Sequence, residues 1–212
     1  MRLQAVRALG PDLAWIFSTT GQGVDFFDPA RAIRVEAGLA LGPLLRAEST
    51  LVSEVVEFLE HNHDQPPGAA SYSTWLIDRG QYQPAVDELA RALSWEDSQP
   101  VLHEAYAAAL DAAGHSEQAT KRADYITRRW PEYANGWFML ALAHGANQDW
   151  AAAEQAIGSC LTLEPDFARG WYNLAIIHLE KGNREAARGA CERAFGLDPN
   201  DREVGSLLRS LQ

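Results

Sequence analysis

Residues 171–200 have the sequence WYNLAIIHLEKGNREAARGACERAFGLDPN, which holds two segments of helical apolar periodicity separated by a short break. Each segment is long enough for about three or four helical turns. Gly182 lies in the break, and glycine readily adopts the left-handed conformation that ends a helix. Pro199 follows the second segment and prevents its continuation, because proline cannot donate the next helical hydrogen bond. This stretch therefore predicts a helix hairpin.

The same pattern returns upstream with a period of 34. One column of this register holds only alanine, a second holds glycine with one exception, and a third holds proline with one exception. The columns are Ala85, Ala119, Ala153 and Ala187; Gly80, Gly114, Gln148 and Gly182; and Asp97, Pro131, Pro165 and Pro199. Small residues fit where paired helices cross. A fixed period is typical of stacked repeats, since one hairpin cannot bury its apolar face alone.

These units resemble the tetratricopeptide repeat family. Residues 136–166 and 171–200 follow the family pattern of Trp, Leu, small residue, Gly, Ala and Pro, and the two units before them keep fewer of these residues. The resemblance implies an all-α fold, a right-handed α-solenoid of helix-turn-helix repeats. It implies four repeats over 66–201, followed by a C-terminal capping helix; the repeats are 66–99, 100–133, 134–167 and 168–201, and the cap is 202–212.

Residues 1–65 follow a period of 32 instead, since RLQAVRALG at 2–10 realigns with RVEAGLALG at 34–42. Residues 1–45, and above all the phrase DPARAIRVEAGLAL, resemble HEAT-like repeats. We expect a HEAT-like or irregular helical segment over 1–65, in which a helix from about 49 to 60 leads to the repeats. Because the first HEAT-like copy lacks its front half, we expect that Met1 is not the natural start and that the natural protein is longer.

A HEAT-like segment followed by tetratricopeptide repeats resembles the C-terminal part of large bacterial proteins that carry multihaem cytochrome domains upstream. The haem attachment motif Cys-x-x-Cys-His is absent from the sequence, so no haem and no other cofactor is assigned. No apolar stretch approaches the roughly 18–20 residues of a membrane helix, and the N-terminus does not have the pattern of a secretory signal. We expect a cytoplasmic protein, or a periplasmic one if the chain belongs to a longer exported protein.

The charge balance of the sequence limits the class of partner. The chain has 212 residues with 18 Lys and Arg against 29 Asp and Glu, which gives a formal net charge of −11 at pH 7. Binding to nucleic acid or to an anionic membrane depends on a basic surface. The charge balance therefore predicts that the partner is neither nucleic acid nor a membrane.

Candidate catalytic and metal-binding residues are few. His61 and His63 could be two metal ligands, but no Cys or third His completes a site, and a polar helix end is the favoured interpretation. His144 and His178 lie one repeat period apart and are predicted to be packing residues. Neither pair is accompanied by a nucleophile and an acid. The sequence therefore predicts no catalytic site, no metal site and no enzyme.

Other reactive or charged groups also have a structural interpretation. Cys160 and Cys191 fall in apolar columns, where a small buried residue is favoured over a disulfide. A basic cluster on the second helix of one repeat is predicted to be a solvated outer face rather than an anionic docking patch; it contains Lys121, Arg122, Arg128 and Arg129. Most of the seven tryptophans are predicted to lie in the core.

The resemblance also implies a binding surface, because the first helix of each tetratricopeptide pair lines a concave groove that holds a peptide or a helix. By repeat register, the predicted contact residues of the late repeats are Asn135, Phe138, Leu142, Arg169, Tyr172, Ile176 and Leu179. Those of the early repeats are Thr74, Ile77, Glu104, Ala108 and Asp111. The groove is expected to be mildly acidic early and aromatic and apolar late, with Phe138 and Tyr172 as anchors for a hydrophobic helix or strand.

The terminal-carboxylate clamp of some family members is not expected, since Ala70 and Thr74 stand at its Lys and Asn positions. The predicted function is a non-catalytic scaffold that binds a protein or peptide in the groove. The alternative is an accessory structural domain of a longer, possibly redox, multihaem protein with no independent partner. In that case the apolar face packs on another part of the same protein or on a second copy, and the sequence leaves these alternatives open.

Overall fold

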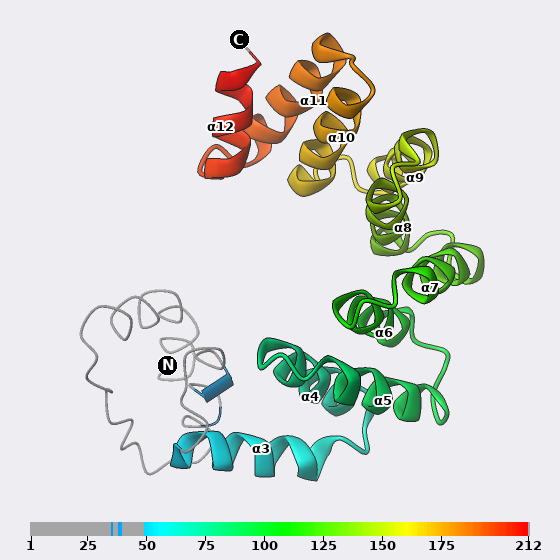
Figure 1. Cartoon of the computed structure of the whole chain (residues 1–212), viewed down its shortest axis with the longest axis vertical. Coiled ribbons are helices and arrows are strands. Elements are labelled where there is room, and N and C mark those ends of the chain that lie inside the picture. The colour runs from blue at the N-terminus through cyan, green and yellow to red at the C-terminus, as the bar shows by residue number, and fades with distance from the viewer. Residues whose placement is uncertain (1–34, 36–37, 40–48, 212) are drawn as a thin grey trace. The chain divides into compact units, whose positions relative to one another are not determined.

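The computed structural model describes residues 35, 38, 39 and 49–211, so the expectations for a HEAT-like segment and for the natural start lie outside this part of the chain. Over the described residues the chain forms helices and no strand, and the predicted all-α fold built of repeated helix hairpins is confirmed (Figure 1). The helices are α3 (Thr50–Asn62), α4 (Pro66–Asp78), α5 (Tyr82–Leu93), α6 (Pro100–Ala112), α7 (Ser116–Arg129), α8 (Ala134–Ala146), α9 (Trp150–Leu163), α10 (Ala168–Glu180), α11 (Arg184–Leu197) and α12 (Arg202–Ser210).

The chain divides into two compact units, Met1–Asp97 and Ser98–Gln212, here called unit 1 and unit 2. In unit 1, α4 and α5 form a hairpin, and α3 packs on α4. The core between α3 and α4 contains Val55, Leu59 and Trp75. Ser49 caps α3, because its hydroxyl accepts a hydrogen bond from the backbone N–H of Val52 at 3.2 Å.

Unit 2 is a stack of hairpins. The pairs α6 and α7, α8 and α9, and α10 and α11 pack together, and each second helix contacts the first helix of the next pair. Figure 1 shows α6, α8 and α10 on the inner side of the curve that unit 2 describes, and α7, α9 and α11 on its outer side. No helix in the described part of the chain is both long enough and apolar enough to cross a bilayer.

The break in each hairpin has a left-handed residue two positions after the first helix. Gly80, Gly114 and Gly182 have φ of 72°, 80° and 77°, and Gln148 has φ of 61° at the corresponding position. Glycine takes this conformation without a Cβ clash, whereas glutamine does so at a cost. All four positions of this column therefore share the left-handed backbone conformation.

Two further glycines allow successive hairpins to approach closely. A Cβ on Gly136 of α8 would lie 2.5 Å from Cγ2 of Ile126 on α7. One repeat later, a Cβ on Gly170 of α10 would lie 2.9 Å from Cδ2 of Leu161 on α9. Because interiors are close-packed, the absence of a side chain at these positions determines how near the helices lie.

The family tryptophans connect each first helix to the turn before it. The indole N–H of Trp137 donates to the carbonyl oxygen of Pro131 at 2.8 Å, and that of Trp171 donates to Pro165 at 2.7 Å. Each ring also packs against a buried core. The repeated Trp and Pro columns are therefore linked directly by a hydrogen bond.

Helix α12 covers the last hairpin. Its buried Val204 and the following Leu211 pack against the core around Cys191. Asp201 caps the helix by accepting from the backbone N–H of Val204 at 3.2 Å. Its other side carries exposed polar residues, namely Arg202, Glu203, Ser206 and Arg209.

Candidate functional site

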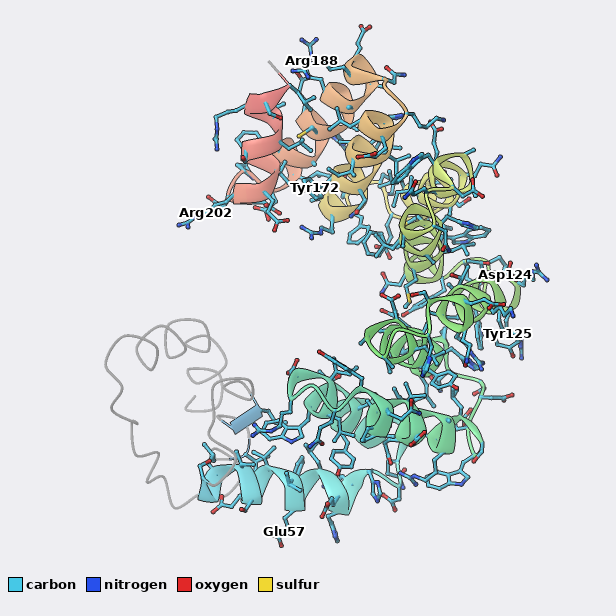
Figure 2. All side chains as sticks on the ribbon, viewed as in Figure 1. Glu57, Asp124, Tyr125, Tyr172, Arg188 and Arg202 are labelled. Carbon is cyan, nitrogen blue, oxygen red and sulfur yellow. The ribbon has the colours of Figure 1, made fainter. Side chains whose placement is uncertain are left out.

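The inner face of unit 2 consists of one side of α6, α8, α10 and α12. Residues three or four positions apart share one side of a helix, and the repeat register aligns these sides between hairpins. By this register we assign to the inner face Val101, Glu104, Ala108 and Asp111 on α6, Asn135, Phe138 and Leu142 on α8, Arg169, Tyr172, Ile176 and Leu179 on α10, and Glu203 on α12. Figure 2 shows Tyr172 beside α12, whereas Tyr125 of α7 lies on the outer side of the curve.

Helix α8 has no charged face. Its sequence, ANGWFMLALAHGA, contains no Asp, Glu, Lys or Arg. Leu140 and Ala141 are buried, but the next residue, Leu142, remains 44% exposed. The exposed side of α8 is therefore uncharged and carries the apolar side chain of Leu142.

The two predicted aromatic anchors are half-buried. Phe138 packs on the core around Ile157, and its ring meets that of Phe167 edge to face with 5.0 Å between centroids. Tyr172 packs on the core around Ala175. Both rings therefore contribute to the packing of the hairpins, whereas Leu142 is exposed.

Hydrogen bonds fix a carboxylate at the α6 side of the inner face. Glu104 accepts a hydrogen bond from the Tyr133 hydroxyl, and Asn135 donates from Nδ2 to its Oε2 at 3.4 Å. Desolvation, together with the contact with the Glu104 carboxylate, raises the pKa of Tyr133 to about 12. Neutral donors thus hold Glu104 in place.

At the opposite side the inner face carries an ion pair. Arg169 donates from Nη1 to Oε2 of Glu203 at 2.8 Å, and its guanidinium lies 5.1 Å from the centre of the Tyr172 ring. Arg169 and Glu203 are separated by one repeat period, so α12 continues the register of the first helices. Both side chains are exposed, and such pairs add little stability. Their main effect is to neutralise each other on this surface.

The structure distributes the predicted contact residues over both units. All seven from the late repeats lie on α8 and α10, together with Glu104, Ala108 and Asp111 on α6 of the same unit. Thr74 and Ile77 lie on α4 in unit 1. The prediction did not include Val101, which is 57% exposed on α6. Its position one repeat period before Asn135 was the signal that could have identified it.

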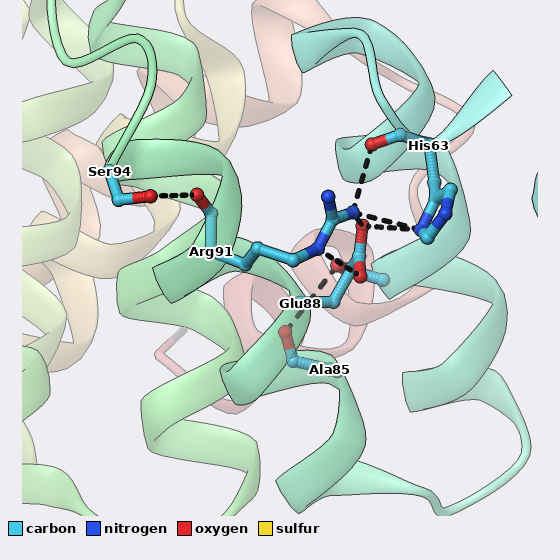
Figure 3. Close-up of polar contacts among 6 residues, drawn as sticks. His63, Ala85, Glu88, Arg91 and Ser94 are labelled. Atoms are coloured by element: carbon cyan, nitrogen blue, oxygen red, sulfur yellow. Dashed lines mark hydrogen bonds and ion pairs between the residues drawn. The ribbon is translucent and has the colours of Figure 1, made fainter.

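His63 has structural contacts rather than a metal-binding geometry. It follows α3, and its Nδ1 lies 3.1 Å from Oε1 of Glu88 and 2.8 Å from Nη2 of Arg91, both on α5 (Figure 3). Glu88 is buried and also pairs with Arg91. These contacts hold the end of α3 against α5. The described residues contain no group of three or more His, Cys, Asp or Glu side chains that could hold a metal ion.

The two cysteines are free and buried. Burial, with a smaller effect of the Glu164 carboxylate, raises the pKa of the Cys160 thiol to about 11. Burial also raises the pKa of Cys191. Because the thiolate is the reactive form, these environments oppose a nucleophilic role.

Most cations of the α7 basic cluster have partners nearby. Lys121 lies 2.6 Å from Glu117, and Arg128 lies 2.9 Å from Asp124, in pairs within the helix. Arg122 stacks on neighbouring tyrosine rings. This arrangement is typical of a solvated outer face.

Stacked hairpins with a left-handed residue in each break define a helical-repeat protein. Sequence profiles described as tetratricopeptide repeat match residues 107–159 and 145–211. The chain is a tetratricopeptide repeat protein, as its sequence predicts. No curated protein sequence matches the chain.

Solved structures with similar folds are tetratricopeptide proteins of low sequence identity. TTC0263, a thermophilic TPR protein of Thermus thermophilus, has a TM-score of 0.68 and 18% identity, with 99% of this chain and 98% of that chain covered. Residues 41 to the end of MamA from Desulfovibrio magneticus RS-1 have a TM-score of 0.57 and 14% identity, with 95% and 97% covered. The first TPR of Spaghetti (RPAP3), bound to the HSP90 peptide SRMEEVD, has a TM-score of 0.52 and 16% identity, with 55% and 92% covered.

Proposed function

We propose that this protein is an interaction scaffold and that the inner face of unit 2 binds an apolar-faced helix or strand of a partner protein. The observation that carries the proposal is α8, which contains no charged residue and leaves Leu142 44% exposed. Apolar surface that is removed from water on binding stabilises a complex by about 25 cal/mol per Å² before the costs of association.

The neighbouring helix extends this apolar surface. Tyr172, Ile176 and Leu179 lie on one side of α10 and are half-buried. Aromatic and aliphatic groups anchored in a core are the usual sites of strong interface contacts, because little side-chain entropy is lost there on binding. Such a surface fits the apolar side of an amphipathic helix or alternate residues of an extended strand.

We expect this protein to recognise its ligand differently from the way in which an acidic peptide is bound. The peptide in the Spaghetti structure, SRMEEVD, carries two Glu and an Asp. In this chain the clamp positions hold Ala70 and Thr74, which have no charge. Arg169 is the cation on the inner face, and Glu203 already neutralises it. A ligand held by apolar contacts is therefore favoured over one held by a terminal carboxylate.

The occupant can belong to a separate protein, to another part of the same polypeptide, or to a second copy. The four-repeat division of 66–201 and the capping role of 202–212 are part of the same proposal. In each case the contact residues are the same, because the occupant covers the same side of α8 and α10. A separate protein or peptide is the occupant that we propose.

The proposal can be tested with peptides selected by the whole chain from a random phage-displayed library. Leu142→Ser should weaken their binding at least tenfold, about 1.4 kcal/mol, in fluorescence anisotropy. The matched control is Leu163→Ser on the outer helix α9, since Leu163 is 41% exposed. Equal affinities of wild type and Leu142→Ser, or an equal loss in the control, would reject the inner face as the binding surface.

A further inference from the structure

The inner face of unit 2 has an unequal distribution of charge. Helix α6, with the sequence PVLHEAYAAALDA, contains no Lys or Arg, and its two carboxylates, Glu104 and Asp111, are seven positions apart. Residues at this spacing lie on the same side of a helix, with about 10 Å of rise between them. Together they form an acidic strip along α6, with Ala108 between them.

Neither carboxylate of this strip has a cationic partner within the described part of unit 2. Glu104 accepts hydrogen bonds from Tyr133 and Asn135, which are neutral donors. Asp111 accepts from the Ser116 hydroxyl at 3.4 Å. Hydrogen bonds from neutral groups hold a carboxylate in place but leave its negative charge uncompensated.

The rest of the inner face has no uncompensated negative charge. α8 has no charged residue, and on α10 the cation Arg169 is paired with Glu203. The surface therefore changes from acidic at α6 to apolar at α8 and to apolar and aromatic at α10. A ligand that crosses these helices meets negative charge at one end only.

From this arrangement we infer that the ligand is an apolar segment flanked on one side by Lys or Arg, whose basic end lies over α6 and whose apolar residues lie over α8 and α10. The inference rests on the proposed function, because it assigns a charge and a direction to the ligand of the same site.

The ligand's Lys or Arg side chains would pair with carboxylates that are exposed or half-exposed. These ion pairs therefore contribute selectivity rather than most of the affinity. The attraction should also fall as salt is added, because the Debye length shortens from about 10 Å at 0.1 M to about 3 Å at 1 M. The apolar contacts do not share this salt dependence. Charge and apolar contributions can therefore be measured separately.

The experiment uses the full chain and three synthetic peptides that share one Leu- and Phe-containing core and end in Lys, Gln or Glu residues. We expect affinities to follow the order Lys, Gln, Glu, with about tenfold between the first two at low salt. Glu104→Gln combined with Asp111→Asn should abolish the preference for Lys over Gln. Asp111→Asn alone, at an exposed position, should reduce it even if the double variant folds poorly.

The matched control is Glu185→Gln combined with Glu192→Gln on the outer helix α11, which removes the same charge elsewhere. It should keep the preference for Lys. The inference is overturned if wild type binds the Lys and Gln peptides equally, or if the preference survives in the α6 variant. If the three peptides bind equally and Leu142→Ser weakens all of them, only the inference on charge fails. If no peptide binds, or Leu142→Ser has no effect, the proposed function fails with it.

Discussion

Phe138 on α8 and Phe167 immediately before α10 meet edge to face, with 5.0 Å between ring centroids. The contact joins one hairpin to the next, so Phe138 contributes to the packing between repeats and is also one of the anchors of the proposed binding face. Truncating Phe138 would lower stability and remove a binding anchor at once. Leu142, which is 44% exposed on the same helix, separates the two effects and is the better position for a binding test.

Gly136→Ala should destabilise unit 2. The added Cβ would lie 2.5 Å from Cγ2 of Ile126, a fully buried and β-branched side chain that cannot easily move away. Overpacking of this kind typically costs about 1–3 kcal/mol. Urea unfolding followed by circular dichroism measures the change, and an unaltered midpoint would show that α7 and α8 do not need this close approach.

Gly158→Ala and Gly189→Ala should instead stabilise the protein. Both glycines lie inside outer helices, and a Cβ at either position meets nothing within 4 Å. Alanine favours the helix over glycine by about 1 kcal/mol when no clash opposes it. The same urea titration provides the comparison with Gly136→Ala, and a loss of stability here would contradict the packing described for α9 and α11.

Gln148→Gly should raise stability by about 0.5–1 kcal/mol, because Gln148 has a φ of 61°, which glycine adopts without the steric cost that a side chain incurs. Gly114→Gln, in the same column of the register, should have the opposite effect. The Tm of both variants, measured by thermal unfolding, tests the two predictions. Shifts in Tm of the same sign would contradict the claim that this column requires a left-handed backbone conformation.

The repeat register predicted most of the helix hairpins of unit 2. Gln148 shows why the register is more informative than any one residue. Its break keeps the hairpin geometry without a glycine, since the backbone N–H of Asp149 still donates to the carbonyl oxygen of His144 at 2.9 Å. The neighbouring helices impose the turn, so tertiary structure overrides local preference. The fold therefore followed from many columns together rather than from any single residue.

The candidate site was less predictable than the fold. Register identifies residues that share a side of a helix, but it does not tell how deeply a neighbouring repeat buries them. Phe138 is covered by Phe167, and Arg169 is neutralised by Glu203. Both contacts depend on side-chain positions in the next repeat. Val101, which is 57% exposed, lies one repeat period before Asn135, so the register alone was sufficient to predict its position.

Tyr133 should make stability sensitive to alkaline pH. Burial and Glu104 raise its pKa in the folded protein to about 12, above the ordinary value of 10.0. Its contribution is present below pH 10 and decreases as pH rises from about 10 to about 12, because the unfolded state loses its proton first. The difference in Tm between wild type and Tyr133→Phe should be constant below this range and shrink within it. A pH-independent difference would contradict the Glu104 contact.

Arg91→Ala should destabilise unit 1 by about 2–3 kcal/mol, because it leaves the buried Glu88 without its cation. Replacing both members, as in Glu88→Leu with Arg91→Met, should recover most of this loss, since no buried charge remains unpaired. Urea unfolding of the single and double variants measures the difference. A double variant as unstable as Arg91→Ala would show that His63, Glu88 and Arg91 act through packing rather than charge.

The central claim is that a partner segment lies against the exposed side of α8. The most direct measurement places the photo-crosslinking residue p-benzoylphenylalanine at position 142 and, as controls, at positions 125 and 163 on the outer helices α7 and α9, where the native Tyr125 and Leu163 are similarly exposed. On irradiation with a selected peptide, we expect a crosslinked product, identified by mass spectrometry, from position 142 and not from the controls. Equal crosslinking at all three positions, or crosslinking only at 125 or 163, would contradict the account.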